Sequence, residues 1–245
     1  MHPIKVFVNG YTGKMGEETV KAVEKEPSLI LVGKARRGDD FDTLLTQTSP
    51  DVVVDFTHPS CVKQNTLTIL KHNAFPLIGT TGLTEADQIE LDALAKNKNL
   101  GILVCPNFAI GAILMMQFAA QAAKYMPRVE IIEFHHDKKA DAPSGTALKT
   151  ADLIYENNAL INETPLDEKE LIQGARGGAK NRIPIHSIRL PGYVAHQEVI
   201  FGGLGQTLTL RHDTISRESF MPGVVLAIQK IQSLRGLVYG LENVL

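Results

Sequence analysis

The chain has 245 residues, enough for one large domain or two small ones with a sizeable core. A hydrophobic content of 44% and a charged content of 21% are typical of folded globular domains and exclude collagen, coiled coils and disordered chains. The net charge of −2 provides no cationic excess for a nucleic acid or an anionic membrane. We therefore expect no nucleic-acid partner and no membrane partner.

The cysteines and the N-terminus indicate a compartment. Two cysteines, Cys61 and Cys105, cannot form a disulfide framework or, alone, a thiolate metal site. The N-terminal residues lack a positive region followed by a long apolar stretch, so we expect no signal peptide. The most apolar region, 109–123, is shorter than the ~20 residues that span a bilayer. These features predict a cytoplasmic protein that acts on small molecules.

The N-terminal half alternates apolar runs with helical stretches. Continuous apolar strands separated by helices are typical of a parallel sheet covered on both faces, the doubly wound α/β arrangement. The expected strands are Ile4–Val8, Ser28–Val32, Asp51–Phe56, Phe75–Ile78 and Leu100–Val104, and the clearest helices are Met15–Lys25 and Thr84–Lys98.

The pattern changes after Cys105. A helix is expected at Ile110–Lys124, and the remaining strands follow one another without intervening helices at Val129–His135, Ile183–Leu190, His196–Phe201 and Gln206–Asp213. This order predicts an α+β domain with an open mixed, mainly antiparallel sheet. A last helix, Pro222–Leu234, is expected to pack on the first domain. The predicted domains are 1–106 with 218–245, the doubly wound α/β domain, and 107–217, the α+β domain.

A glycine-rich turn lies between the first strand and the first helix. Its residues are Gly10, Tyr11, Thr12, Gly13, Lys14, Met15 and Gly16, in the spacing Gly-x-x-Gly-x-x-Gly. Glycines let main-chain N–H groups approach a pyrophosphate, and the helix N-terminus favours its negative charge. The nucleoside-triphosphate P-loop pattern is not met. The turn predicts a dinucleotide site, and an ordinary glycine-rich turn is the alternative.

The segment after the second strand bears on the choice of dinucleotide. Lys34, Arg36 and Arg37 stand where an NAD-selective site places a carboxylate, so Arg36 is a candidate for binding a 2′-phosphate. We therefore expect NADPH to be used at least as well as NADH, with a solvated basic loop as the alternative. Two loops at the carboxyl ends of expected strands complete the cofactor candidates: Gly79, Thr80 and Thr81, and Cys105, Pro106, Asn107 and Phe108.

The densest group of titratable residues lies at Glu133–Thr146. His135 suits a general acid near neutral pH, and Lys139 suits a cation or second proton donor. Ser144, Gly145 and Thr146 open a helix whose N–H groups could bind a carboxylate. Together these residues predict a small dianionic substrate that receives a proton.

Other interpretations of this segment remain. A metal site from His135, His136, Asp137 and Asp141 is disfavoured because adjacent residues of a strand point to opposite faces, and we expect no metal. Ser144 as a nucleophile lacks the Gly-x-Ser-x-Gly elbow. A capped helix beside solvated lysines is the structural alternative. The basic stretch 174–182, with Arg189, His196 and Arg217, could aid capture of a dicarboxylate but is expected to be a loop between strands.

The pattern Glu-x-His-His-x-x-Lys-x-Asp-x-Pro-Ser-Gly-Thr-Ala at Glu133–Ala147 resembles the signature of the dihydrodipicolinate (4-hydroxy-tetrahydrodipicolinate) reductase family. The resemblance covers most of the chain, including Gly10–Gly16, Asp55–Thr57, Gly79–Gly82 and Asn107–Phe108. It implies NADPH- or NADH-dependent reduction of a cyclic dicarboxylate imine in lysine and diaminopimelate biosynthesis, by a cytoplasmic homotetramer assembled through the second domain's sheet.

The resemblance also implies residue roles. His135 and Lys139 match the family's proton donors, and His136, Gly145 and Thr146 match positions that hold the substrate carboxylates. Hydride is expected to go to the ring carbon adjoining the departing hydroxyl after closure between the domains. The family's frequent acidic residue after the second strand aligns near Ala35, so a strict NADH preference is not expected. The rival classes are another two-domain reductase and a non-catalytic dinucleotide sensor.

Overall fold

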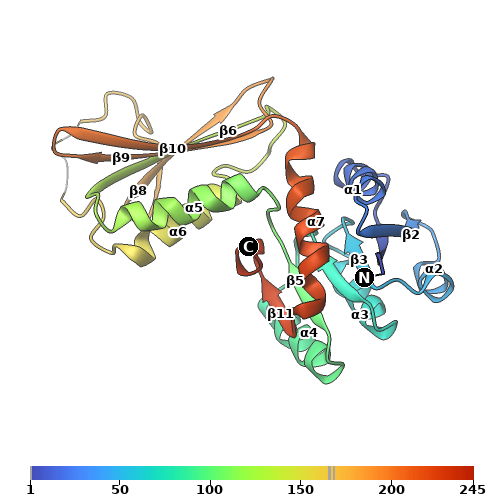
Figure 1. Cartoon of the computed structure of the whole chain (residues 1–245). Coiled ribbons are helices and arrows are strands. Elements are labelled where there is room, and N and C mark those ends of the chain that lie inside the picture. The colour runs from blue at the N-terminus through green and yellow to red at the C-terminus, as the bar shows by residue number, and fades with distance from the viewer. Residues whose placement is uncertain (1, 165–166, 168) are drawn as a thin grey trace. The chain divides into compact units, whose positions relative to one another are not determined.

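A computed structural model describes residues 2–164, 167 and 169–245. The chain divides into two compact units, residues 1–110 with 217–245 and residues 111–216 (Figure 1). The chain therefore crosses between the units at 110/111 and 216/217, whereas the sequence places the boundaries at 106/107 and 217/218.

The first unit is built on a six-stranded, all-parallel sheet. The strand order is β2-β1-β3-β4-β5-β11, so the chain leaves β1 on one side for β2 and returns to the other side for β3. Ligands of such sheets bind outside the carboxyl ends of the strands at this reversal. The strands are β1 (Ile4–Asn9), β2 (Leu29–Ala35), β3 (Val52–Asp55), β4 (Phe75–Ile78), β5 (Gly101–Val104) and β11 (Gly236–Tyr239).

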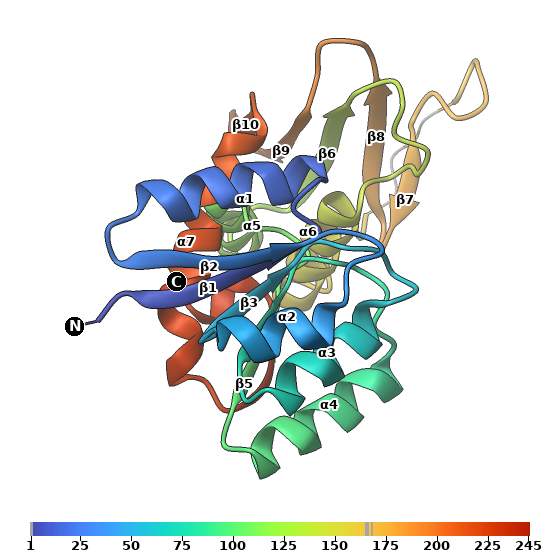
Figure 2. The ribbon, with the colours of Figure 1, turned by 90° about the vertical axis from the view of Figure 1, so that its right-hand side faces the viewer.

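Helices cover both faces of this sheet (Figure 2). One face carries α1 (Lys14–Lys25) and α7 (Met221–Lys230), which meet where the Thr19 hydroxyl contacts the sulfur of Met221 at 3.9 Å. The other face carries α2 (Phe41–Thr48), α3 (Val62–Lys71) and α4 (Glu85–Asn97). Fully buried Phe7, Val53 and Ile102 lie in the core beneath them, which fits the continuous apolar strands of the sequence.

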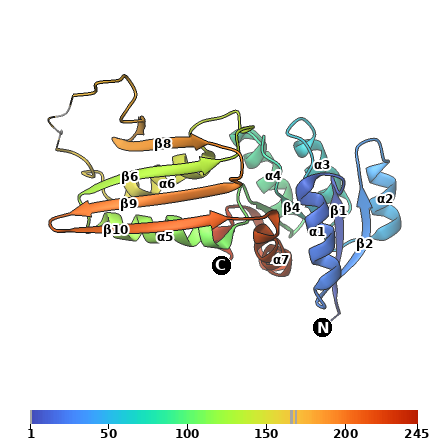
Figure 3. The same cartoon turned by 90° about the horizontal axis from the view of Figure 1, so that it is seen from above.

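The second unit pairs one five-stranded sheet with two helices, α5 (Ile110–Ala123, whose first residue belongs to the first unit) and α6 (Gly145–Asn157), which lie against one face (Figure 3). The order is β10-β9-β6-β8-β7, with β6 and β8 parallel and the other pairs antiparallel. The predicted mixed sheet is therefore confirmed. The strands are β6 (Arg128–His135), β7 (Gly178–Lys180), β8 (Ile183–Arg189), β9 (Ala195–Gly203) and β10 (Gln206–Thr214).

Two short edge strands are absent from the sequence prediction. β11 begins at Gly236, shortly after the stretch expected to be the last helix, Pro222–Leu234; the helix itself ends at Lys230 and is followed by a short 3₁₀ turn. β7 lies within the glycine-rich basic stretch 174–182, whose composition indicated a loop, and β11 follows directly on an apolar stretch whose pattern indicated a helix. Among the described residues, no helix is long and apolar enough to cross a membrane.

Candidate functional site

In the Gly10–Gly16 turn, two glycines lie very close to other main-chain atoms. Gly10 has φ +84°, and a Cβ there would lie 2.3 Å from the carbonyl oxygen of Phe56. A Cβ at Gly16 would lie 2.2 Å from the carbonyl oxygen of Gly10. Gly13 caps α1 without a side-chain hydrogen bond, so no side chain at the cap covers the helix N-terminus. This geometry fits a pyrophosphate held by main-chain N–H groups.

A cavity of about 580 Å³ opens over this turn at the reversal of the sheet. Arg36 and Arg37, which follow β2, line it together with Gly10 and Gly13, which follow β1. Of the predicted cofactor residues, Gly10, Thr12, Gly13 and Arg36 share this cavity. Further lining residues, to which the sequence analysis assigns no cofactor role, come from the ends of β1, β2 and β3 and the segments after them: Asn9, Gly38, Asp39, Phe41, Phe56, Thr57, His58, Ser60, Cys61 and Asn65.

The other predicted cofactor residues lie outside that cavity. Tyr11 packs beside it, with Lys34 Nζ 4.9 Å from its ring centroid, and Lys14, Met15 and Gly16 belong to α1. Thr80, Thr81 and Pro106 line a second, small hollow with Tyr239. Gly79 follows β4 directly, where a Cβ would lie 2.1 Å from the Phe56 ring.

In the Cys105–Phe108 loop, the side chains of Cys105, Asn107 and Phe108 are buried or hydrogen-bonded within the protein. The Cys105 thiol is buried, and burial, together with the charge of Glu242, raises its pKa. Phe108 is buried edge-on against Phe56, with ring centroids 5.6 Å apart. The Asn107 side chain accepts the Ala109 N–H at 2.8 Å. Cofactor contacts of Cys105 would therefore come from its main chain.

Asp55, at the end of β3, organises the centre of the cofactor region. It is fully buried, and its carboxylate accepts hydrogen bonds from Asn9 and Asn65 at 3.0 and 2.8 Å and from Thr80 at 2.8 Å. It thereby ties the ends of β1, β3 and β4 together. The sequence analysis assigns Asp55 no role, although a carboxylate at the end of an apolar strand is a usable signal.

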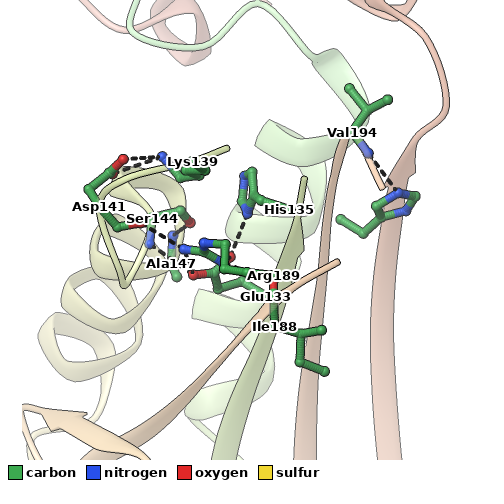
Figure 4. Close-up of polar contacts among 10 residues, drawn as sticks. Glu133, His135, Lys139, Asp141, Ser144, Ala147, Ile188, Arg189 and Val194 are labelled. Atoms are coloured by element: carbon green, nitrogen blue, oxygen red, sulfur yellow. Dashed lines mark hydrogen bonds and ion pairs between the residues drawn. The ribbon is translucent and has the colours of Figure 1, made fainter. Parts of the chain in front are cut away.

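In the second unit, the end of β6 carries a three-residue cluster (Figure 4). Glu133 is fully buried, and its carboxylate accepts a hydrogen bond from His135 Nδ1 at 2.5 Å. Arg189, the last residue of β8, binds the same carboxylate in a bidentate manner at 2.8 and 2.7 Å. We call Glu133, His135 and Arg189 the inner cluster.

The ionisation of Glu133 follows from these contacts. Burial opposes its charge, but hydrogen bonds from His135, Arg189 and Ser187 outweigh this effect and lower its pKa from 4.5 to about 2. The inner cluster therefore contains a carboxylate that stays charged throughout the neutral pH range. His135 is the member with a free ring nitrogen: in the described part of the chain, Nε2 has no hydrogen-bond partner.

The loop after β6 brings the other predicted residues to this cluster. Lys139 forms an ion pair with Asp141 at 2.7 and 2.8 Å, and the Asp141 carbonyl oxygen accepts a hydrogen bond from Arg189. Ser144 caps α6 by accepting the Ala147 N–H, as expected for a helix N-cap.

The predicted substrate residues have open surroundings. The N–H groups of Gly145 and Thr146 donate to no acceptor in the described part of the chain. A Cβ at Gly145 would meet no atom within 4 Å. His136, half-buried, follows directly after β6. The α6 N-terminus can therefore bind a carboxylate.

The basic stretch 174–182 does not gather free cations for substrate capture. Arg176 pairs with Glu130, Lys180 pairs with Asp152, and the Arg182 guanidinium donates to the Ala159 carbonyl. Arg189 is likewise committed to Glu133. Within the described residues, no group of three or more histidine, cysteine, aspartate or glutamate side chains is arranged to hold a metal ion.

Comparisons with known proteins identify the family. Residues 4–108 match the family model for the N-terminus of dihydrodipicolinate reductase, and residues 111–245 match the model for its C-terminus. The chain belongs to the dihydrodipicolinate reductase family. The resemblance seen in the signature is thus confirmed, and the protein is an oxidoreductase that uses NADPH or NADH.

Individual relatives agree over their whole length. The 4-hydroxy-tetrahydrodipicolinate reductase of Listeria innocua is 49% identical, covering 99% of this chain and 100% of the relative. That of Syntrophomonas wolfei is also 49% identical, covering 98% of each.

Solved structures agree as well. A dipicolinate-bound dihydrodipicolinate reductase from Paenisporosarcina sp. TG-14 superposes with a TM-score of 0.91 at 45% identity, covering 99% of this chain and 100% of the other. An amine dehydrogenase from Mycobacterium smegmatis shares the fold alone, with a TM-score of 0.64 at 13% identity, covering 96% and 94% of the chains.

Proposed function

We propose that the protein reduces 4-hydroxy-tetrahydrodipicolinate to tetrahydrodipicolinate in lysine and diaminopimelate biosynthesis, with His135 and Lys139 as its proton-transferring residues. The names of the relatives support the substrate, and the Paenisporosarcina relative binds dipicolinate, a ring with two carboxylates. The observation that carries the residue roles is the position of His135, held through Nδ1 by a buried carboxylate and open at Nε2.

The reaction adds one hydride and one proton to the substrate, and the ring hydroxyl leaves as water. The reduced nicotinamide supplies the hydride when it is bound. His135 donates this proton from Nε2 when its ring is doubly protonated, since Nδ1 is engaged by Glu133. The N–H groups of Gly145 and Thr146, with His136, hold the carboxylates, and Lys139 leaves Asp141 to add a positive charge beside them.

The test is oxidation of reduced nicotinamide with freshly generated 4-hydroxy-tetrahydrodipicolinate. Oxidation that depends on this substrate supports the proposal. Oxidation that proceeds equally without it, or with an unrelated semialdehyde or polyol instead, contradicts it. Lys139→Ala should lower kcat and raise KM, because the lysine both moves a proton and pairs with the substrate. An unchanged KM would leave Lys139 with a purely chemical role.

Arg36 and Arg37 support use of NADPH at least as well as NADH. Both line the cavity over the glycine-rich turn, where a guanidinium suits a 2′-phosphate. Replacing both by alanine should raise KM for NADPH by about 10-fold or more and change KM for NADH by less than about threefold. A wild-type kcat/KM ten times higher with NADH would contradict the proposal.

One face of the second unit's sheet also supports the proposal of a homotetramer. The face of its sheet away from α5 and α6 carries half-buried apolar side chains from three strands, namely Ile132, Phe134, Ile188 and Ile200. We place the subunit contacts on this face. Light scattering should give the mass of four chains; the mass of one chain would contradict it.

The two free thiols fit a reducing compartment, in agreement with a cytoplasmic location.

A further inference from the structure

We propose that Glu133 and Arg189 are positioning residues that together fix the ring of His135 and the loop that carries Lys139. The inference rests on the proposed function for the roles of His135 and Lys139. It concerns a buried ion pair whose two partners come from different strands and lie 56 residues apart in the chain.

The register of the sheet brings the pair to His135. Glu133 precedes His135 by two residues on β6, so both side chains emerge on the same face. In the parallel pairing of β6 and β8, the partner of His135 is Arg189 itself. The carboxylate, the guanidinium and the imidazole are therefore neighbours because of strand pairing that a linear motif does not contain.

Both carboxylate oxygens of Glu133 are fully used. Oε2 accepts from His135 Nδ1 and Arg189 Nη1, and Oε1 accepts from Arg189 Nη2 and from the Ser144 N–H at 3.2 Å. One side chain thus joins β6, β8 and the residue that caps α6 (Figure 4). The open N–H groups of Gly145 and Thr146 begin directly after that cap.

Arg189 extends the same connection into the loop. Its Nη2 also donates to the Asp141 carbonyl oxygen at 2.8 Å, and Asp141 holds Lys139 through its carboxylate. The Nε atom of Arg189 is buried without a partner in the described part of the chain. Leaving a buried donor unpaired is costly. The guanidinium keeps this position because its Nη atoms bind Glu133 and the Asp141 carbonyl oxygen.

The consequence for His135 is a fixed tautomer. An ionised carboxylate can only accept a hydrogen bond, so it keeps the proton of the neutral ring on Nδ1 and leaves Nε2 for the substrate. An amide in place of the carboxylate could accept from Nδ1–H or donate to Nδ1, so it would no longer select one tautomer.

The test is Glu133→Gln, with Glu130→Gln as the matched control. Glu130 lies on the same strand and also binds one arginine and one histidine, but on the other face of the sheet. Glu133→Gln should lower kcat by about 10²–10⁴-fold, the upper end being the loss that the same carboxylate-to-amide change causes in the Ser-His-Asp triad, with KM for the reduced cofactor within about twofold. Glu130→Gln should change kcat by less than about threefold.

A spectroscopic readout separates positioning from stability. In nitrogen-15 NMR spectra of the wild-type protein at a pH where the ring is neutral, His135 should carry its proton on Nδ1. In Glu133→Gln the population protonated on Nε2 should rise, while Glu130→Gln should match the wild type. A wild-type ring protonated on Nε2 would overturn the proposal whether or not any variant folds.

The double variant Glu133→Gln with Arg189→Met removes both charges and so avoids a buried unpaired arginine if the single variant unfolds. It should show the same loss of kcat and the same mixed tautomer. A kcat within threefold of wild type in either variant would overturn the proposal. If the wild type fails to reduce the substrate, the proposed function fails, while the NMR experiment still decides whether Glu133 sets the tautomer.

Discussion

The two faces of strand β6 carry the same three residue types in different surroundings. On the face against α6, Glu133 binds His135 and Arg189; on the other face, Glu130 binds His186 and Arg176. We call the second group the outer cluster. The Glu133 side chain is 0% exposed, whereas that of Glu130 is 35% exposed.

This difference shows that composition alone does not make a site. The pKa of both glutamates is lowered, because hydrogen bonds from arginine and histidine outweigh burial in each cluster. Only the inner cluster adds a capped helix N-terminus and a lysine loop. These surroundings support our proposal that the histidine of the inner cluster transfers the proton.

The largest expected difference is between the two histidines. His135→Gln should lower kcat by about 10²–10⁴-fold, because a general acid contributes that much. His186→Gln removes the corresponding residue of the outer cluster and should change kcat by less than about threefold. Steady-state kinetics with both variants measures the contrast. A drop of less than threefold in a folded His135→Gln would remove His135 from the chemistry.

The arginines should differ in their effect on stability. Arg189→Met leaves the buried Glu133 charge without its main partner and should lower the free energy of unfolding by about 3–5 kcal/mol. Arg176→Met breaks a more exposed pair and should cost no more than about 1 kcal/mol. Urea unfolding of both variants checks this. Equal losses would mean that burial does not distinguish the clusters.

The pH dependence of stability should report Glu133. Its pKa is lowered in the folded protein, so its contribution is present above the unfolded value of about 4.5 and lost as the pH falls toward about 2. Urea unfolding across this window should show a pH dependence that Glu133→Gln reduces. Glu130→Gln should reduce it less. A pH dependence unchanged by Glu133→Gln would contradict the lowered pKa.

The smallest expected effect concerns two glycines of the second unit. A Cβ at Gly145 or at Gly178 would meet no atom within 4 Å, so alanine at either position should leave stability nearly unchanged. Gly145→Ala should nevertheless raise KM for the substrate by several-fold, because it adds a methyl group at the α6 N-terminus, whereas Gly178→Ala should not. Calorimetry and kinetics on the pair test this. An unchanged KM in Gly145→Ala would place the substrate elsewhere.

The sequence predicted the features that depend on local pattern. Apolar runs and intervening helices gave the parallel sheet, and His135, Lys139 and Ser144 lie close together in the chain. Glu133 and Arg189 were not assigned to one cluster because their contact depends on the register of β6 and β8, which no local pattern encodes. The sequence does contain one signal for this cluster. Glu133 alternates with Val129 and Ile131 on the buried face of β6, where a charged side chain requires a partner.

Asp55 was missed for a similar reason. Its partners Asn9, Asn65 and Thr80 come from three separate segments that meet only at the carboxyl edge of the sheet. Arg176 and Lys180 illustrate the opposite case: a basic cluster in the sequence becomes a set of separate ion pairs in the fold. Linear proximity predicts a site only when the chain keeps those residues on one face.

The most direct test of the account follows a label through the reaction. The wild-type protein should be supplied with 4-hydroxy-tetrahydrodipicolinate and with NADPH that carries deuterium at its transferable position. Mass spectrometry and NMR should find one deuterium on the product ring for each cofactor oxidised, with the hydroxyl lost. Transfer should slow by about 10²–10⁴-fold in His135→Gln. Deuterium in the solvent, or cofactor oxidation without labelled product, would contradict the account.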